Sequence, residues 1–445
     1  AQRKRLWDKL RAHGPPRLVE LFEAQRRRHE AVAAGRPLPG QKYLVWSLAG
    51  GLGNRFLSLA STFMAAVLSE RVFLMKDWFT PLPRGNTKQT PVIIPSPNST
   101  EYFLEDLRKV FAPASCPRNV ELLCPFLPMM SLSEFRDMYP AEFDARNHAE
   151  HAKVDIAARH DRKLVRWNRF MCAPLNGHAQ GIRQPDRDAA IFFREKFVYV
   201  WTNQYYLPAL FANPHHSADM RAMFPTNRPY QDLIGLLAVP SLPVVKRIKA
   251  FFDREREANG VAVDRSGPRY DALQIRAFQR HAIAGMARDF DTCWSRMKRL
   301  AGDGSSRAPF FLASMHGAVR KHFFSRYGNA TRVQAPPTEE QCTGVCDAAC
   351  DQEGFADMML LALSGRLLVS PGSTFGMFVS AFAQKPPIAV RDQGSCRAIP
   401  NVEPCFGSWF RRDHILRRAT AVSPDSPFSC RIDDVPAGIV NCEQS

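Results

Sequence analysis

The stretch Gly-Gly-Leu-Gly-Asn-Arg, residues 50–55, decides the fold of this chain. It follows an apolar run at residues 43–48 that predicts a buried strand, and it precedes an apolar segment, residues 56–68, that predicts a helix. A second apolar strand is expected at residues 71–75. Strand, glycine turn, helix and strand in this order indicate a βαβ unit. Glycines at such a turn let a ligand approach the backbone, and the helix N-terminus favours anions there.

The same turn is similar to the fingerprint of nicotinamide-dinucleotide enzymes, because Gly51 and Gly53 precede a helix. In that fingerprint a third glycine lets the helix pack closely on the strand, and Phe56 stands at that position here. Asn54 and Arg55 instead bring an amide and a guanidinium to the start of the helix. A dinucleotide site and a purely structural turn stay open as alternatives.

Length and composition limit the classes of function. With 445 residues, 45% of them hydrophobic, the chain is long enough for two domains with large cores. The formal net charge is +17, and outside an Arg-rich segment at residues 1–38 it is spread thinly. A nucleic-acid-binding module would concentrate this charge in a stripe, so we predict no nucleic-acid partner. The basic surface is either solvated or serves a polyanionic or nucleotide-bearing ligand.

Cysteines and glycosylation sequons indicate an oxidising, secretory compartment. The chain has 11 cysteines, and Asn98 and Asn329 each begin an Asn-x-Thr/Ser sequon, so we predict both as glycosylation sites. Cys342, Cys346 and Cys350 are spaced to share one helical face, which suggests a metal site. However, this is not the spacing of a zinc site, and the compartment favours disulfides there. We therefore predict no bound metal.

The sequence also indicates whether this chain crosses a membrane. No run of about 20 apolar residues occurs, as a membrane-spanning helix would need. The sequence also lacks an initiating Met and a signal peptide, and we interpret it as an ectodomain whose membrane anchor has been removed. Residues 1–40 are expected to be a basic, helical stem that ends in a Pro- and Gly-containing turn.

The later part of the chain alternates short apolar strands with helices, which predicts a parallel, doubly wound sheet. A strand at residues 196–201 and a helix over residues 207–224, with a break at Pro214, come first, and a long helix at residues 244–258 follows. The expected strands after that are residues 271–276, 309–314, 366–370 and 387–390, and the expected helices are residues 284–300, 354–363 and 375–383.

Several polar residues follow these strands, at the edge where parallel sheets bind ligands. Arg276 ends a strand, and its guanidinium suits a diphosphate or, alternatively, a structural carboxylate. His316 opens a helix after another strand. Ser373 and Thr374 offer hydroxyl and N–H groups at a helix start, although such a Ser is often only an N-cap. Asn203 follows the strand at residues 196–201.

Two further residues have both a functional and a structural interpretation. Phe375 would stack on a nucleobase or fill the core. Asp357 lies on a helix between apolar neighbours and would receive a nucleobase or sugar hydroxyl, or face solvent. No carboxylate occupies a motif that identifies it as a catalytic base.

Six segments resemble, in order, the sequence blocks of the plant xyloglucan fucosyltransferase family, glycosyltransferase family 37. The first is the glycine stretch itself, and another, Leu-Gln-Ile-Arg, is similar to the Gln-Val-Arg motif of that family. The departures include Pro371-Gly372 before Ser373-Thr374, where the family has x-Trp, and they indicate a remote member. The segments are residues 50–61, 203–211, 273–276, 356–362, 373–376 and 403–406.

The resemblance implies a GT-B fold of the α/β class, with two Rossmann-like domains that face each other across a cleft. It divides the chain into the stem, an acceptor-side N-terminal domain at residues 41–240, a GDP-sugar-binding domain at residues 241–395, and a Cys-rich tail at residues 396–445 that packs back on the domains. It also implies a Golgi type II membrane enzyme. Its activity would be an inverting transfer of L-fucose from GDP-fucose, without metal or another cofactor, to a hydroxyl of a cell-wall polysaccharide or a glycoprotein glycan.

Roles for single residues follow by position in the matching blocks. Arg276 would hold the donor diphosphate and act in catalysis together with Asn54, which alternatively only caps its helix. Further residues would line the donor side and the acceptor side of the active site. A related enzyme with an L-galactose or arabinose donor, and a non-catalytic glycan-binding relative, stay open, as does homodimerisation. The donor side is Arg276, Ser373, Thr374, Phe375, Asp357 and His316, and the acceptor side is Gly51, Gly53, Asn54, Arg55 and Asn203.

Overall fold

A computed structural model describes most of the chain. The described part divides into two compact units, one up to Val239 and the other within Pro240–Glu403. The boundaries predicted for stem, domains and tail stay predictions. The described residues are 2–48, 52–76, 130–131, 135, 138–140, 152–155, 196–202, 205, 207–212, 216–240, 242–259, 270–276, 283–300, 309–334 and 348–399.

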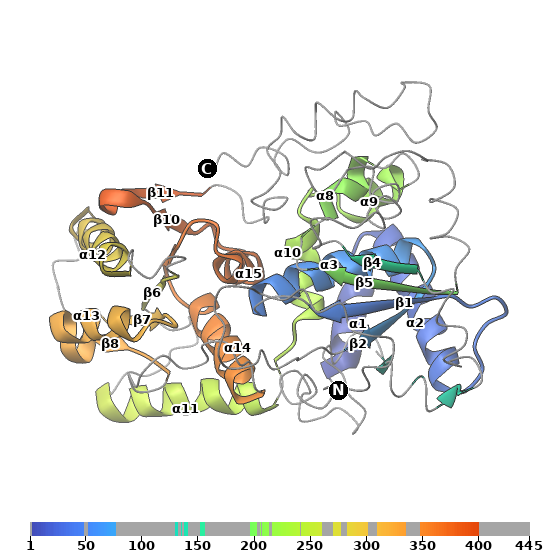
Figure 1. The fold of residues 1–445 in the computed structure, drawn as a ribbon, viewed down its shortest axis with the longest axis horizontal. Helices are drawn as coiled ribbons and strands as arrows, with labels where there is room; N and C mark the ends of the chain where they lie inside the picture. The colour runs from blue at the N-terminus through green and yellow to red at the C-terminus, as the bar shows by residue number, and fades with distance from the viewer. Residues whose placement is uncertain are drawn as a thin grey trace. The chain divides into compact units, whose positions relative to one another are not determined.

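The first unit is built on a parallel sheet with the strand order β3-β2-β1-β5-β4 (Figure 1). The predicted βαβ unit is confirmed, because α3 connects β1 to β2 and these two strands pair in parallel. The strands are β1 Tyr43–Leu48, β2 Val72–Lys76, β3 Met130–Ser131, β4 Ala152–Asp155 and β5 Phe197–Thr202. The helices are α1 Gln2–His13, α2 Pro16–Ala33, α3 Leu52–Leu68, α8 Leu207–Ala212, α9 Ser217–Met223 and α10 Pro229–Leu237.

Helix α2 packs into the core of the first unit. Its buried residues, which recur every three or four positions, are Leu18, Phe22, Gln25, His29 and Val32. The ring of Phe22 lies edge-on to Phe63 of α3, with 5.5 Å between the ring centroids. The Arg-rich composition of this segment, which predicts a stem, conceals the apolar stripe. In the structure α2 is a core element of this unit.

A buried arginine joins three elements at the amino-terminal edge of the first sheet. Arg71, 1% exposed, donates from Nη1 to the carbonyls of Tyr43 and Lys196 at 3.1 and 3.3 Å. Its own carbonyl accepts a hydrogen bond of 2.8 Å from Nε2 of Gln25 in α2. The guanidinium therefore adds hydrogen bonds to carbonyls at the starts of β1 and β5.

The second unit has a six-stranded sheet of order β11-β10-β9-β6-β7-β8 (Figure 1). The strands pair in parallel, as predicted, except that β11 returns antiparallel to β10. The strands are β6 Asp271–Gln274, β7 Phe310–Ala313, β8 Thr331–Arg332, β9 Leu367–Val369, β10 Ile388–Val390 and β11 Cys396–Ala398. The helices are α11 Leu242–Asn259, α12 Ile283–Leu300, α13 Gly317–Tyr327, α14 Ala348–Ala362 and α15 Thr374–Ala383, with short 3₁₀ turns at Gly328–Ala330 and Asp392–Gly394.

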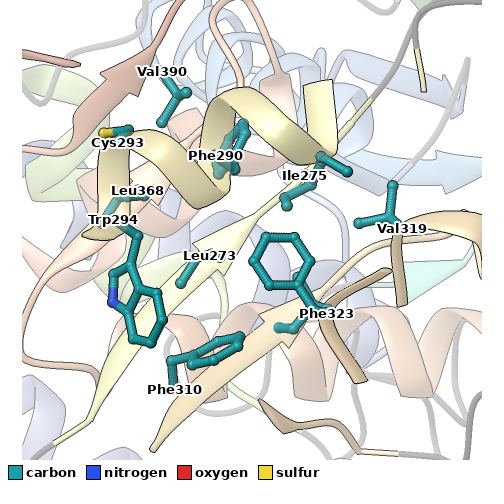
Figure 2. Close-up of a cluster of buried hydrophobic side chains, with 12 residues drawn as sticks. Leu273, Ile275, Phe290, Cys293, Trp294, Phe310, Val319, Phe323, Leu368 and Val390 are labelled. Carbon is teal, nitrogen blue, oxygen red and sulfur yellow. The ribbon is translucent and has the colours of Figure 1, made fainter. Parts of the chain in front are cut away.

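Helices cover both faces of this sheet. On one face, Phe290 and Trp294 of α12 and Phe323 of α13 pack with Leu273 and Phe310 of the central strands (Figure 2). On the opposite side lie α11 and α14 (Figure 1). Because side chains alternate along a strand, consecutive residues of β6 enter different layers. Leu273 therefore belongs to the α12 layer, whereas Ala272 and Gln274 face the other one.

The central strand β6 is fixed at its start by a buried carboxylate. Asp271 accepts two hydrogen bonds of 2.8 Å from Nε and Nη2 of Arg366, which immediately precedes β9. The indole of Trp294 in α12 donates to the same carboxylate at 3.0 Å. A bidentate pair of this kind is geometrically specific, so it sets β6 against both β9 and α12.

A disulfide closes the outer edge of the second unit. Cys293 of α12 is bonded to Cys396 of β11, with 5.6 Å between the Cα atoms. It agrees with the oxidising compartment expected from the cysteine content. Cys342 and Cys346 lie outside the described residues. No helix in the described part of the chain is long and apolar enough to cross a bilayer.

Candidate functional site

Three adjacent strands of the second sheet deliver the predicted donor-side residues to one edge. The central strand β6 lies between β7 and β9, and all three run in parallel. Arg276 follows β6, His316 follows β7 as the residue before α13, and Ser373 follows β9 as the residue before α15. Their carboxyl ends therefore bring a guanidinium, an imidazole and a helix start together, as the sequence predicted for this edge.

The guanidinium of Arg276 lies against the loop that follows β7. Its Nη1 contacts the sulfur of Met315, and its backbone N–H donates to the hydroxyl of Ser370 at 2.8 Å. Although the side chain is exposed, the surrounding protein desolvates it in part and lowers the pKa of Arg276 from its ordinary value. Arginine remains charged at physiological pH even so, and its planar fork suits a phosphate.

The start of α15 lies beside this guanidinium in the sheet order. Ser373, 5% exposed, occupies the N-cap position with extended backbone angles, but its side chain makes no capping hydrogen bond. Ser373 thus stands at the N-cap position of α15, but its side chain does not cap the helix. Thr374 and Phe375 are the first two helical residues, and both are partly buried. Helix N-termini present N–H groups and a positive partial charge, which favour an anion.

Close packing of α15 on the sheet depends on Gly376. A Cβ atom at this position would lie 3.0 Å from Oε1 of Gln274 in β6 and 3.0 Å from the Cβ and Cγ1 atoms of Val369 in β9. Gln274 is buried, and its Oε1 has no hydrogen-bond partner in the structure. Gly376 therefore lets the first turn of α15 approach the ends of β6 and β9 closely.

Asp357 of α14 is partly buried, and one of its carboxyl oxygens is shielded from solvent. Its Oδ1 is inaccessible to solvent and has no hydrogen-bond partner in the structure. Burial, together with the charge of Glu353, raises the pKa of Asp357 to about 8, and Arg320 and Arg247 oppose this shift. The carboxyl group is therefore mostly protonated at neutral pH.

The loop between β7 and α13 is held by Arg320 of α13 and by a hydrogen bond within the loop. Nη1 of Arg320 donates to the carbonyl of Ser314, and the backbone N–H of His316 donates to the Ser314 hydroxyl at 3.2 Å. Arg320 is also close enough to Asp357 to interact electrostatically with its carboxyl group, while desolvation lowers the pKa of Arg320. Arg320 thus connects the His316 loop with α14.

The predicted acceptor-side residues belong to the first unit, and only some of them are described. Gly53 and Arg55 are buried in α3, Arg55 with 6% exposure, and Asn54 is partly buried. Asn54 is the third residue of α3. Gly51 and Asn203 lie outside the described residues.

The two predicted glycosylation sites, Asn98 and Asn329, fall in different parts of the chain. Asn98 lies outside the described residues, whereas Asn329 is exposed in the 3₁₀ turn before β8. The hydroxyl of Thr331 in that sequon is buried and donates to the carbonyl of Phe323 at 3.1 Å. Within the described ranges, no group of three or more His, Cys, Asp or Glu side chains could hold a metal ion.

Three residues at this edge were missed from the sequence. Ser370, Gln274 and Arg320 connect the predicted residues to one another, and no role followed for them from the sequence. Ser370 contacts Arg276 and Gln274, which lie more than 90 positions away along the chain, so no local pattern could indicate these contacts. Gln274 precedes Arg276 by two residues, and that proximity was the one available signal.

Comparisons with known proteins agree with the sequence resemblance. A model of the xyloglucan fucosyltransferase family matches residues 29–79. The chain is 22% identical over 406 residues to probable fucosyltransferase 7 of Arabidopsis thaliana, covering 82% of the chain and 67% of that relative. It is also 22% identical over 433 residues to galactoside 2-alpha-L-fucosyltransferase of Pisum sativum, covering 89% and 68%. It spans only 60% of the length of probable fucosyltransferase 5 of Arabidopsis thaliana.

A solved structure shares the fold. A mutant of Arabidopsis thaliana FUT1 in complex with GDP superposes with a TM-score of 0.54 at 17% identity, over 91% of this chain and 83% of that one. The predicted α/β class of the GT-B type is therefore confirmed. The arrangement of the two units about a cleft stays a prediction.

We expect Gly376→Ala to destabilise the protein. The new methyl group would press on Val369, which is buried in β9 and cannot yield, so α15 must shift at a cost of about 1–3 kcal/mol. The matched control is Gly285→Ala, because Gly285 is likewise the third residue of its helix but has open space at the Cβ position. That control should gain stability through helix propensity. Urea unfolding of both variants measures this, and a stable Gly376→Ala protein would contradict the close approach.

We expect Asp357→Asn to remove a pH dependence of stability. The ordinary aspartate pKa is 3.8, and the folded value is about 8, so between these values the unfolded chain releases a proton that the native protein keeps. Wild-type stability should therefore fall with rising pH across that window, by roughly 1 kcal/mol per pH unit, and level off above it. Urea unfolding at pH 5 to 9 measures the free energy of unfolding of both proteins. Up to pH 8, the stability of the variant should rise relative to that of the wild type. A constant difference between the two proteins would refute the buried, protonated carboxyl group.

Proposed function

Because this chain is a remote relative of the plant xyloglucan fucosyltransferases, we propose that it is a glycosyltransferase that transfers L-fucose from GDP-fucose to a hydroxyl group. The named relatives are fucosyltransferases, and the solved structure that shares the fold binds GDP. That bound GDP is the support for the donor nucleotide in this proposal.

The observation that carries this proposal is the edge formed by β9, β6 and β7. Arg276 and the start of α15 stand at the ends of two neighbouring strands, and they supply a guanidinium fork and a helix N-terminus. Both are groups that bind phosphate oxygens. A nucleoside diphosphate needs this pairing because its two phosphates carry more charge than one contact neutralises. Ser373, Thr374, Phe375, His316 and Asp357 are the further donor-side residues of the proposal.

The proposed reaction is a single displacement at the anomeric carbon. The acceptor oxygen forms a bond to that carbon while the bond from the carbon to the β-phosphate oxygen breaks, and the electron pair leaves with GDP. The acceptor proton passes to solvent or to a weak base, and the anomeric configuration inverts. Negative charge grows on the β-phosphate during this step, so a positioned guanidinium lowers the barrier electrostatically.

Metal independence belongs to the same proposal. In many nucleotide enzymes a divalent cation neutralises the diphosphate. Here Arg276 and the α15 N-terminus would supply the compensating positive charge from the protein itself. We further propose a Golgi-lumenal enzyme whose acceptor is a cell-wall polysaccharide or a glycoprotein glycan, with Gly51, Gly53, Asn54, Arg55 and Asn203 on the acceptor side.

We expect Arg276→Ala to reduce GDP-fucose turnover by roughly two orders of magnitude, as the loss of one transition-state contact commonly does. Arg276→Lys should recover little activity, because the fork geometry is lost. Turnover is measured as GDP release in the presence of EDTA, with a panel of glycan acceptors. The wild type should stay active under these conditions.

The matched control is Arg299→Ala, since Arg299 is an exposed arginine at the end of α12. It should keep full activity. Near-normal turnover in Arg276→Ala would remove this residue from the donor site, and activity that EDTA abolishes and Mn²⁺ restores would refute metal independence. Release of GDP from the GDP derivative of L-galactose or of arabinose, but not from GDP-fucose, would identify a related transferase with another donor, and no turnover of any of the three would leave a glycan-binding relative.

A further inference from the structure

A tight turn connects β9 to α15. The carbonyl of Ser370 accepts the N–H of Ser373 at 3.2 Å, which closes a four-residue turn. Pro371 is its second residue, and Gly372, with a φ of 70°, is its third. This combination fits a type II turn, in which proline presets the first angle and glycine accepts the positive one. The turn therefore fixes where α15 begins relative to the end of β9.

The same turn interrupts the hydrogen-bond ladder between β9 and β6. Along the ladder, the N–H of Ala272 donates to Arg366 at 2.8 Å, and the N–H of Ser370 donates to Gln274 at 3.1 Å. A regular parallel ladder would continue from the N–H of Arg276 to the carbonyl of Ser370. That carbonyl closes the turn, and the hydroxyl of Ser370 accepts the Arg276 N–H instead, at 2.8 Å.

We propose that Ser370 is a positioning residue whose hydroxyl holds Arg276 at a fixed distance from the start of α15. One side chain thus connects the two parts of the anion-binding edge: its backbone sets the turn into α15, and its oxygen holds the backbone from which Arg276 projects. This inference rests on the proposed function, because it assigns a role within the same donor site.

The surroundings of Ser370 keep its hydroxyl oxygen available to the N–H of Arg276. The residue is 2% exposed, so water cannot readily replace it. The hydroxyl can donate its one hydrogen either to the carbonyl of Gln274 at 3.5 Å or to the sulfur of Met286 at 3.6 Å, and in both cases it keeps a lone pair for the N–H of Arg276. An alanine would remove the acceptor, and the backbone at Arg276 would lose its tie to the turn. A cysteine of similar volume would offer only a weak acceptor.

The test is a double-mutant cycle on GDP affinity, measured by titration calorimetry with the whole chain. Ser370→Ala and Ser370→Cys should each weaken GDP binding about tenfold and lower turnover, the size expected for one lost hydrogen bond. In the Arg276→Ala background, the same Ser370 changes should have almost no further effect on GDP affinity, because the residue that they displace is absent. Using both Ala and Cys keeps the test valid if one variant fails to fold.

Ser364→Ala is the matched control. Ser364 is a buried serine in the turn before β9, at the opposite edge of the same sheet. Its hydroxyl donates a hydrogen bond of 2.7 Å to the carbonyl of Leu361. This variant should lose a similar amount of thermal stability and keep wild-type GDP affinity. A purely structural role for Ser370 would make the two serine variants alike.

Two results would overturn the inference. Wild-type GDP affinity in folded Ser370→Ala or Ser370→Cys protein would show that the hydroxyl does not position Arg276. Fully additive effects of the Ser370 and Arg276 changes would show that they act separately. If Arg276→Ala itself leaves GDP affinity unchanged, the proposed donor site fails first, so the two failures are distinguishable.

Discussion

The central position of β6 between β9 and β7 is the constraint on which the rest of the second unit depends. At the start of the strand, Asp271 binds Arg366 in two places and accepts the indole N–H of Trp294. Just past its end, the backbone at Arg276 bonds to the hydroxyl of Ser370. Between these points the strand is buried throughout. A strand fixed at both ends cannot slip in register, so the residues that follow it stand at defined positions.

The chemistry of the candidate site follows from this placement. Parallel neighbours end at the same edge, so one guanidinium, one imidazole and one helix start meet there without a long loop to carry them. Gly376 lets α15 approach the strand ends, and Arg320 holds the loop of His316 from the side. The groups that would face a diphosphate are therefore supported by buried polar contacts, and such support is what preorganises a binding site.

The buried polar groups of the two units have contrasting roles. In the first unit, Arg71 and Gln25 satisfy main-chain carbonyls and tie α2 to the sheet. In the second unit, Gln274 and Asp357 keep acceptor atoms without hydrogen-bond partners in the structure. Unsatisfied buried acceptors cost stability and are therefore uncommon. Both residues lie on elements that border the candidate site. The unpaired acceptors that reduce stability therefore lie close to where a ligand would bind.

Sequence reasoning was most reliable where local pattern and fold agree. The apolar strands around residues 50–55 predicted the first βαβ unit, and the alternation after residue 270 predicted the second sheet and the edge that bears Arg276. Composition concealed α2, since its arginines dominate the segment while a narrow stripe is buried. The antiparallel return of β11 depends on a tight turn with Gly394 at a φ of 68°, and a three-residue strand carries little periodicity.

The residues that could not be predicted act over long sequence separations. Ser370 reads as an ordinary strand end, and its bond to Arg276 exists only because the Pro-Gly turn occupies its carbonyl. Asp357 gave a signal in its apolar neighbours, but those neighbours could not reveal whether its carboxyl group was buried. Such features depend on which strands become adjacent, and adjacency is a property of the whole sheet.

The central claim is that the edge formed by β9, β6 and β7 binds a guanosine diphosphate. Hydrogen–deuterium exchange of the whole chain, with and without GDP, tests it most directly because it reports on backbone N–H groups at each place. The account predicts slower exchange in peptides that cover residues 370–377 and 274–276, with little change in α12. Protection absent from these peptides at saturating GDP would contradict it.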